Sequence, residues 1–167
     1  MKNILVAVDF EKGIDPILKQ AITTAKAYKS KLWIIHVVRA VKSQIGYSLS
    51  NQNLPGLMAS GEGYYNQLFD LETTRKMVAT ELHQEHNTLL RYCNSIKEEN
   101  IEVQGLLIEG DPAEVILTET IKKEIDLIIL GTHGHGLLHK TLVGSISEQV
   151  IHKSTKPILL IPTQIKI

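Results

Sequence analysis

Five short runs of apolar residues, most of them rich in β-branched side chains, recur along this chain. They lie at residues 3–9, 32–38, 101–108, 125–130 and 157–161. A continuous apolar run of this length is typical of a strand that is buried on both faces, as the strands of parallel sheets are. The stretches between the runs have the apolar spacing of helices, at about residues 16–28, 67–99, 110–123 and 147–154. This alternation predicts a single α/β domain over residues 1–167.

Two aspartate–proline pairs mark the expected starts of helices. Asp15 precedes Pro16, and Asp111 precedes Pro112. An aspartate side chain accepts hydrogen bonds from the first free N–H groups of a helix, and proline suits the first turn because it has no N–H to leave unpaired. We therefore expect each aspartate to be the N-cap of a helix.

Parallel strands that are joined by helices need right-handed crossovers, which place helices on both faces of an open sheet. We expect the five strands in the order 3-2-1-4-5, so that the first and fourth strands are neighbours where the order reverses. Ligands of such sheets bind beyond the carboxyl ends of the strands at this point. Asp9 ends the first strand and Gly131 follows the fourth, so the two residues are expected to meet in one crevice.

The segment between the fourth strand and the last helix is rich in glycine. It contains Gly131, Gly134 and Gly144, and Gly144-Ser145 leads into the helix. Glycine permits positive φ values and lets a ligand approach bare backbone N–H groups. The N-terminus of a helix adds free N–H groups and the positive end of its dipole. The pattern therefore indicates a cradle for phosphate groups.

Four features of the sequence resemble the universal stress protein family, in its ATP-binding branch. They are Ile4-Leu-Val-Ala-Val-Asp9, a second strand that ends in His36-Val37, the spacing Gly131-x-x-Gly134, nine residues, Gly144-Ser145, and the closing Lys156-Pro157-Ile-Leu-Leu-Ile161. The resemblance covers nearly the whole chain except about residues 40–66. It implies an adenine-nucleotide α-hydrolase-like fold, a homodimer and ATP bound in the crevice.

The resemblance also implies roles for individual residues. Adenosine would contact the ends of the first two strands, at Ala7, Val8, Asp9 and the backbone of Val37. The ribose and phosphates would be flanked by the start of the glycine segment, at Leu130, Gly131, His133 and Gly134. Phosphate oxygens would be bound by its end, at Gly144, Ser145, Ile146 and Ser147. Mg²⁺ or Mn²⁺ would be held through the phosphates, with Asp9 bonded to a ribose hydroxyl or lying in the outer shell of the metal.

Plainer interpretations stay open for some of these residues. The glycine segment could be an ordinary strand–helix loop in which Ser145 or Ser147 caps the helix. Asp9 could cap a neighbouring turn. His36 lies on a strand that is expected to be buried, and we interpret it as a hydrogen-bonded core histidine rather than a catalyst.

Motifs of known catalytic sites do not match the chain. A P-loop needs Gly-Lys-Ser/Thr, and the dinucleotide fingerprint needs several glycines after the first strand, where only Gly13 is found. The hydrolase elbow Gly-x-Ser-x-Gly is missing too. The sequence therefore favours an ATP-binding regulatory or stress-response protein over a dedicated enzyme. The most catalysis we expect is slow ATP hydrolysis or self-phosphorylation. The alternatives are a nucleotide-independent dimeric interaction module and a weak ATPase.

Charge and cysteine content narrow the expected partners and compartment. Lys and Arg number 18, as do Asp and Glu, so nothing suggests nucleic acid or a membrane as a partner. The N-terminal apolar run is too short for a signal peptide or a membrane span. Cys93 is the single cysteine, which excludes an internal disulfide and fits a reducing cytoplasm. We therefore expect a cytoplasmic protein.

Two segments suggest contacts with other chains. The last strand, at residues 158–161, would lie at a sheet edge, and pairing with its copy in a homodimer would cover it. Residues 41–65 have a weak pattern and are longer than a usual strand–helix connection. We expect them to form a lid, a loop that binds a protein partner of unknown identity, or a partly disordered loop.

Overall fold

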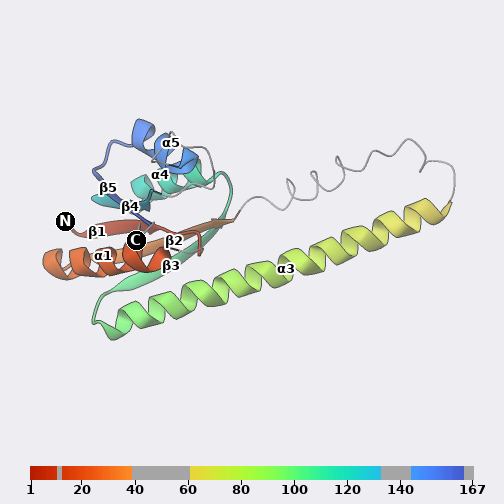
Figure 1. The fold of residues 1–167 in the computed structure, drawn as a ribbon, viewed down its shortest axis with the longest axis horizontal. Helices are drawn as coiled ribbons and strands as arrows, with labels where there is room; N and C mark the ends of the chain where they lie inside the picture. The colour runs from red at the N-terminus through yellow and green to blue at the C-terminus, as the bar shows by residue number, and fades with distance from the viewer. Residues whose placement is uncertain (11–12, 39–60, 133–143, 164–167) are drawn as a thin grey trace.

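A five-stranded parallel sheet forms the centre of the fold in the computed structural model, which describes residues 1–10, 13–38, 61–132 and 144–163 (Figure 1). The strands are β1 (Asn3–Ala7), β2 (Lys31–Val38), β3 (Val103–Glu109), β4 (Leu127–Gly131) and β5 (Ile158–Ile161). Their order in the sheet is β3-β2-β1-β4-β5, and all four pairings are parallel. The expected open sheet and its strand order are confirmed.

Helices cover both faces of the sheet, as expected. They are α1 (Ile14–Tyr28), α3 (Gly61–Glu98), α4 (Pro112–Lys122) and α5 (Ser145–Lys153). Buried side chains of α1 and α3 pack in one cluster with one face of the strands, and those of α4 and α5 pack in a second cluster with the other face. The two faces bury alternate residues of β1, because Ile4 and Val6 belong to the first cluster and Leu5 to the second. Burial on both faces explains why the strand sequences are continuously apolar.

Only the C-terminal part of α3 packs on the sheet, and its N-terminal part projects beyond the body of the molecule (Figure 1). Leu89, Cys93 and Ile96 of α3 are buried against the strands. Gly105 of β3 makes this close packing possible, because a Cβ atom there would lie 2.9 Å from Leu89 Cγ and 3.1 Å from Cys93 Sγ.

The two expected N-caps have different outcomes. Asp111 is the N-cap of α4, and its Oδ1 accepts a hydrogen bond from the backbone N–H of Glu114 at 3.0 Å. The prediction for Asp15 is wrong, because α1 begins at Ile14 and its N-cap is Gly13, whose φ of 109° lies in the left-handed region. Thr163 also approaches Gly13 closely, so a residue without a side chain is needed there. Asp15 lies inside the first turn of α1, where its negative charge interacts favourably with the positive end of the helix dipole.

The start of α3 also differs from the expectation. The helix begins at Gly61, so residues 61–65 are helical rather than part of a loop, and residues 41–60 lie outside the described residues. Gly61 and Gly63 lie in the first turn of α3. Glycine costs about 1 kcal/mol within a helix, which a 38-residue helix tolerates near its end.

Candidate functional site

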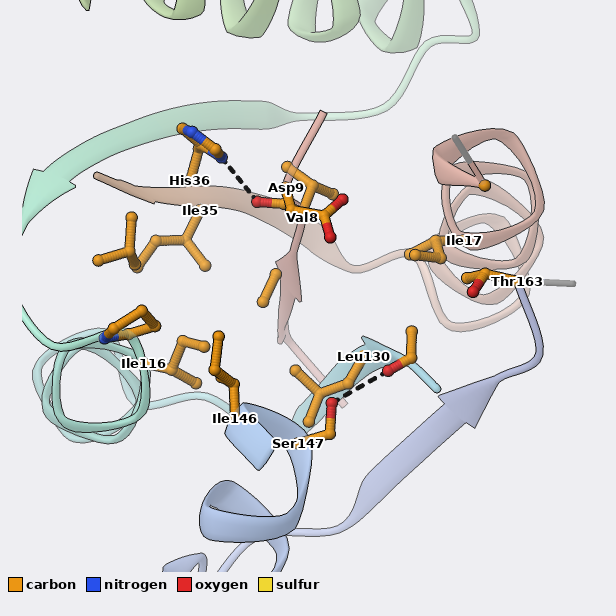
Figure 2. Close-up of a pocket in the computed structure, with 15 residues that line it drawn as sticks. Val8, Asp9, Ile17, Ile35, His36, Ile116, Leu130, Ile146, Ser147 and Thr163 are labelled. Atoms are coloured by element: carbon orange, nitrogen blue, oxygen red, sulfur yellow. Dashed lines mark hydrogen bonds between the residues drawn. The ribbon is translucent and has the colours of Figure 1, made fainter. Parts of the chain in front are cut away.

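A pocket lies at the carboxyl edge of the sheet, where β1 and β4 are neighbours and the strand order reverses. Its cavity volume is about 140 Å³. Figure 2 shows Ile35, Ile116 and Ile146 together on one side of the pocket, with Ile17 and Thr163 on the other. The lining residues are Ala7, Val8, Asp9, Gly13, Ile17, Ile35, His36, Val37, Pro112, Ile116, Leu130, Gly131, Ile146, Ser147 and Thr163.

Most of the site residues that the sequence analysis proposed lie at this pocket. Those in its lining are Ala7, Val8, Asp9, Val37, Leu130, Gly131, Ile146 and Ser147. Gly144 and Ser145 are not in the lining. They are the N-cap and the first residue of α5, and the two residues that follow them, Ile146 and Ser147, do line the pocket. His133 and Gly134 lie outside the described residues. The structure therefore brings together residues from both halves of the chain that the sequence placed in one crevice.

The backbone N–H and C=O groups of Val37, a pocket-lining residue of β2, point toward β1. The N–H of Val8 donates to the carbonyl of Ile35 at 3.0 Å, whereas the carbonyl of Val38 accepts from Gly110 at the other side of the strand. Backbone groups in a parallel strand alternate between its two neighbours, so those of Val37 point toward β1, as those of Ile35 do. The pairing of β1 with β2 stops at Ala7 and Ile35. Val37 therefore presents an N–H and a C=O beyond the last pair of the ladder.

His36 contacts the backbone at the point where the ladder stops, and Phe10, two residues beyond Val8, has a left-handed φ of 58°. The carbonyl of Val8, which a longer ladder would turn toward Val37, accepts a hydrogen bond from His36 Nδ1 at 2.8 Å (Figure 2). The residue is 6% exposed, and its ring stacks on Phe10 with centroids 4.2 Å apart. The interpretation of His36 as a hydrogen-bonded core histidine is confirmed.

The N-terminus of α5 also borders the pocket, through Ile146 and Ser147. Its N-cap, Gly144, is extended and contributes no side chain, so neither Ser145 nor Ser147 caps the helix as the plainer interpretation suggested. The hydroxyl of Ser147 instead donates to the carbonyl of Gly131 at 3.0 Å (Figure 2). This bond joins the first turn of α5 to the end of β4. Ser145 is exposed.

Gly131 is required for packing rather than for an unusual backbone conformation. A Cβ atom at this position would lie 2.9 Å from Ile17 Cδ1 and 3.0 Å from Thr163 Cγ2. Positive φ values occur instead at Gly13 and Gly110 among the described glycines. Gly131 therefore has a packing role that the sequence did not suggest, and the approach of a ligand to its backbone stays a prediction.

The sequence analysis missed seven lining residues, which lie in or after strands and in the first turns of helices: Gly13, Ile17, Ile35, His36, Pro112, Ile116 and Thr163. Pro112 had a usable signal, because it follows the carboxyl end of β3. Thr163 had a similar one, since it lies two residues beyond β5. Ile17 and Ile116 had no such signal, because an apolar residue in a helix is expected to pack in the core and nothing marks it as part of a pocket.

Asp9 contributes an exposed carboxylate to the pocket, directly beyond β1. Among the described residues, no group of three or more His, Cys, Asp or Glu side chains is arranged to hold a metal ion. No described helix is both long and apolar enough to span a membrane. The chemistry available in the described pocket is thus an apolar wall, one carboxylate, an open backbone edge and a helix N-terminus.

Comparison with known proteins gives one consistent result. The sequence model of the universal stress protein family matches residues 1–162. Universal stress protein MJ0577 of Methanocaldococcus jannaschii is 30% identical over 164 residues, which are 96% of this chain and 94% of the relative. Its solved structure has a TM-score of 0.73 to this chain at 21% identity, over 99% of this chain and 98% of the other.

Two further solved structures share the fold and contain nucleotides. A universal stress protein from Archaeoglobus fulgidus in complex with dAMP has a TM-score of 0.57 at 17% identity, over 96% of this chain and 98% of the other. A universal stress protein in complex with cAMP has a TM-score of 0.61 at 15% identity, over 98% of both chains. At these identities the likeness concerns the fold.

Proposed function

The chain belongs to the universal stress protein family, and we propose that it binds an adenine nucleotide, ATP above all, in the pocket at the carboxyl edge of its sheet. Nucleotide binding would make the protein a regulatory or stress-response module whose association with a protein partner depends on occupancy. The observation that carries the proposal is the backbone of Val37, which lies past the last β1–β2 pair of the described residues and beside an apolar wall. The dAMP and cAMP complexes of other family members support an adenine ligand.

The edge of Val37 suits adenine in particular. One N–H donor and one C=O acceptor on the same side of a strand match the ring nitrogen acceptor and the exocyclic amino donor of the Watson–Crick edge of adenine. Guanine in the same pose would turn a donor toward the N–H and an acceptor toward the carbonyl. Ile35, Ile116 and Ile146 provide the apolar surface on which a flat base is buried (Figure 2).

The N-terminus of α5 suits the phosphates. Its first N–H groups lack partners within the helix, and the helix dipole adds about 0.3–1 kcal/mol for an anion. Micromolar binding requires about 8 kcal/mol, so hydrogen bonds and burial of the base must supply most of it. In the proposed complex, Asp9 of the pocket lining accepts from a ribose hydroxyl or holds a water of a phosphate-bound Mg²⁺ or Mn²⁺. By family resemblance, His133 and Gly134 complete the proposed site.

Calorimetric titration of the purified protein tests the proposal. ATP, ADP and AMP are added in turn in the presence of MgCl₂, and GTP serves as the base control. We expect saturable binding of the adenine nucleotides and much weaker binding of GTP. The absence of heat at millimolar adenine nucleotide would refute the proposal and favour the nucleotide-independent interaction module.

A charge variant then tests where the phosphates lie. Ser145→Asp puts a carboxylate on an exposed residue at the start of α5, where the helix dipole tolerates it. We expect loss of ATP binding with an unchanged melting temperature. Ser95→Asp makes the same change on an exposed residue of α3 and should leave binding intact. Equal affinities of the two variants would mean that the phosphates bind elsewhere.

We also propose a two-fold homodimer formed through β5. This strand lies at the edge of the sheet, pairs with β4 alone within the sheet, and keeps all four of its residues half-buried. Pairing with a second copy would satisfy its open backbone groups. Light scattering at micromolar concentration should report a dimer, and a monomer would remove the proposal.

A further inference from the structure

Phe10 has a left-handed backbone conformation in an unusual place. Among the described residues other than glycine, positive φ values occur at Phe10, Lys29, Asn100 and Glu124. The last three lie within two residues of the end of a helix, where a left-handed residue commonly closes the final turn. Phe10 instead lies three residues beyond the end of β1, with a φ of 58°. A bulky side chain disfavours this conformation, so the surroundings must hold it there.

Two aromatic rings hold the side chain of Phe10. Its ring stacks on His36 of β2 with centroids 4.2 Å apart, and on Tyr92 of α3 with centroids 5.9 Å apart. Phe10 and Tyr92 are half-buried against the first core cluster. The ring of His36 is itself in contact with two elements, because its Nδ1 is 2.8 Å from the carbonyl oxygen of Val8 and its Nε2 is 3.4 Å from Oε1 of Glu85 on α3. The stack therefore ties the segment after β1 to both β2 and α3.

The turn at Phe10 coincides with the start of the pocket. The N–H of Val8 donates to the carbonyl of Ile35 at 3.0 Å, and the described pairing of β1 with β2 goes no further. Because β2 continues to Val38, Val37 lies past the last pair. Asp9, directly before Phe10, lines the pocket (Figure 2). An extended residue 10 would instead carry the chain on alongside β2 and bring its backbone within reach of Val37.

We propose that Phe10 is a positioning residue for the pocket. Its stacked ring holds a left-handed turn that leads the chain away from β2, places Asp9 at the pocket and leaves the backbone edge of Val37 to a ligand. Phe10 is not in the pocket lining, so it acts through its neighbours rather than by touching a nucleotide. The role toward a ligand rests on the proposed nucleotide function, whereas the role of the ring in holding the turn does not.

Substitutions at residue 10 separate the turn from the ring. Phe10→Gly and Phe10→Val both remove the stack, but glycine adopts a left-handed φ freely and a β-branched residue resists it. Phe10→Tyr keeps a ring and is the conservative variant. Lys29→Val is the matched control, because it places valine at another left-handed position, the exposed C-cap of α1 with a φ of 53°, outside the pocket lining. If Phe10→Val does not fold, Phe10→Ala takes its place, since alanine also disfavours a left-handed φ.

The first measurement uses the full chain without nucleotide. Amide hydrogen exchange by NMR reports whether the backbone of Val37 is paired, with the amide of Ile35 inside the β1–β2 ladder as the reference. In the wild type, Phe10→Tyr, Phe10→Gly and Lys29→Val, the Val37 amide should exchange faster than that of Ile35. In Phe10→Val its exchange should slow, because an extended chain pairs with β2. Equal exchange at Val37 in Phe10→Gly and Phe10→Val would overturn the inference, whatever the protein binds.

The second measurement is the affinity of the folded variants for ATP, by calorimetry. Phe10→Val should weaken binding on the order of tenfold, the factor that corresponds to the cost of a left-handed conformation. Phe10→Gly should lose less and Phe10→Tyr least, whereas Lys29→Val should lower the melting temperature and leave the affinity unchanged. If the wild type binds ATP and the glycine and valine variants at residue 10 bind it equally well, the positioning role is refuted. If the wild type binds no nucleotide, the proposed function fails and the exchange of the Val37 amide alone decides.

Discussion

Ser145 and Ser147 lie two residues apart on the first turn of α5, yet the structure gives their hydroxyl groups different tasks. Ser147 is 8% exposed, and its hydroxyl donates to the carbonyl of Gly131. Ser145 is exposed at the helix start. Replacing each serine by alanine removes one oxygen atom from the same turn, so the pair forms a matched comparison. We predict that Ser147→Ala lowers stability and that Ser145→Ala lowers nucleotide affinity.

The size of the stability loss follows from the bond between Ser147 and Gly131. A hydrogen bond within a protein contributes about 0.5–1.5 kcal/mol net, and leaving a half-buried carbonyl without its donor adds to the cost. Alanine favours helix slightly more than serine does, which offsets up to about 0.5 kcal/mol. The expected net loss is about 1 kcal/mol, or about 2–4 °C in Tm for a chain of this size. Ser145→Ala should stay within about 0.5 kcal/mol of the wild type.

Urea unfolding followed by circular dichroism measures the free energy of unfolding of the three proteins without nucleotide. The slope of the free energy against urea should be the same for all three, so that midpoints can be compared directly. Calorimetry with ATP then gives the affinities. The reasoning would be refuted if Ser147→Ala were as stable as the wild type, or if Ser145→Ala were the less stable variant.

Three other outcomes are expected from residues that do not line the pocket. Asp111→Ala should cost about 0.5–2 kcal/mol in urea unfolding through the loss of the α4 cap, and more than Asp15→Ala, which removes only a dipole contact of about 0.3–1 kcal/mol. Hydrogen bonds from the backbone N–H groups of Lys2 and Asn3 lower the pKa of Asp126, so the stability it contributes is present above about pH 4 and is lost as the pH falls further. The deficit of Asp126→Asn relative to the wild type should therefore shrink when unfolding is measured below pH 4, and a constant deficit would contradict this. Burial raises the pKa of the Cys93 thiol, so iodoacetamide should label it, as followed by mass spectrometry, only at the rate of unfolding.

The sheet was predictable because its information is local and redundant. Each strand is an apolar run that stands out within a few residues, and the crossover rule leaves few ways to order five parallel strands. The crevice between Asp9 and Gly131 follows from that order alone. The two aspartates show the limit of local signals. Asp15 and Asp111 both precede a proline, and each lies within two residues after a glycine with positive φ. Nevertheless, Gly13 itself is the N-cap of α1, whereas Asp111 is the N-cap of α4.

The remaining parts of the site depend on contacts between distant residues. Ser147 could be recognised as part of the glycine segment, but its bond to Gly131 depends on how α5 returns to the end of β4. Thr163 and Ile17 meet over Gly131 because three elements converge there. The partnership of His36 with Glu85 joins residues from a strand and a long helix, and neither sequence neighbourhood indicates the other. Sequence patterns therefore predicted the strand ends of the pocket better than its walls.

Because α3 packs on the sheet only through its C-terminal part, a small change of its angle there moves its N-terminal end over a larger distance. From Glu85 to Gly61 the axis extends by about 24 residues, or about 36 Å at the usual helical rise. A tilt of about 5° where α3 meets the sheet would move the far tip by about 3 Å over this length. Subtle rearrangements beneath the helix would thus be magnified into displacements large enough for another macromolecule to sense.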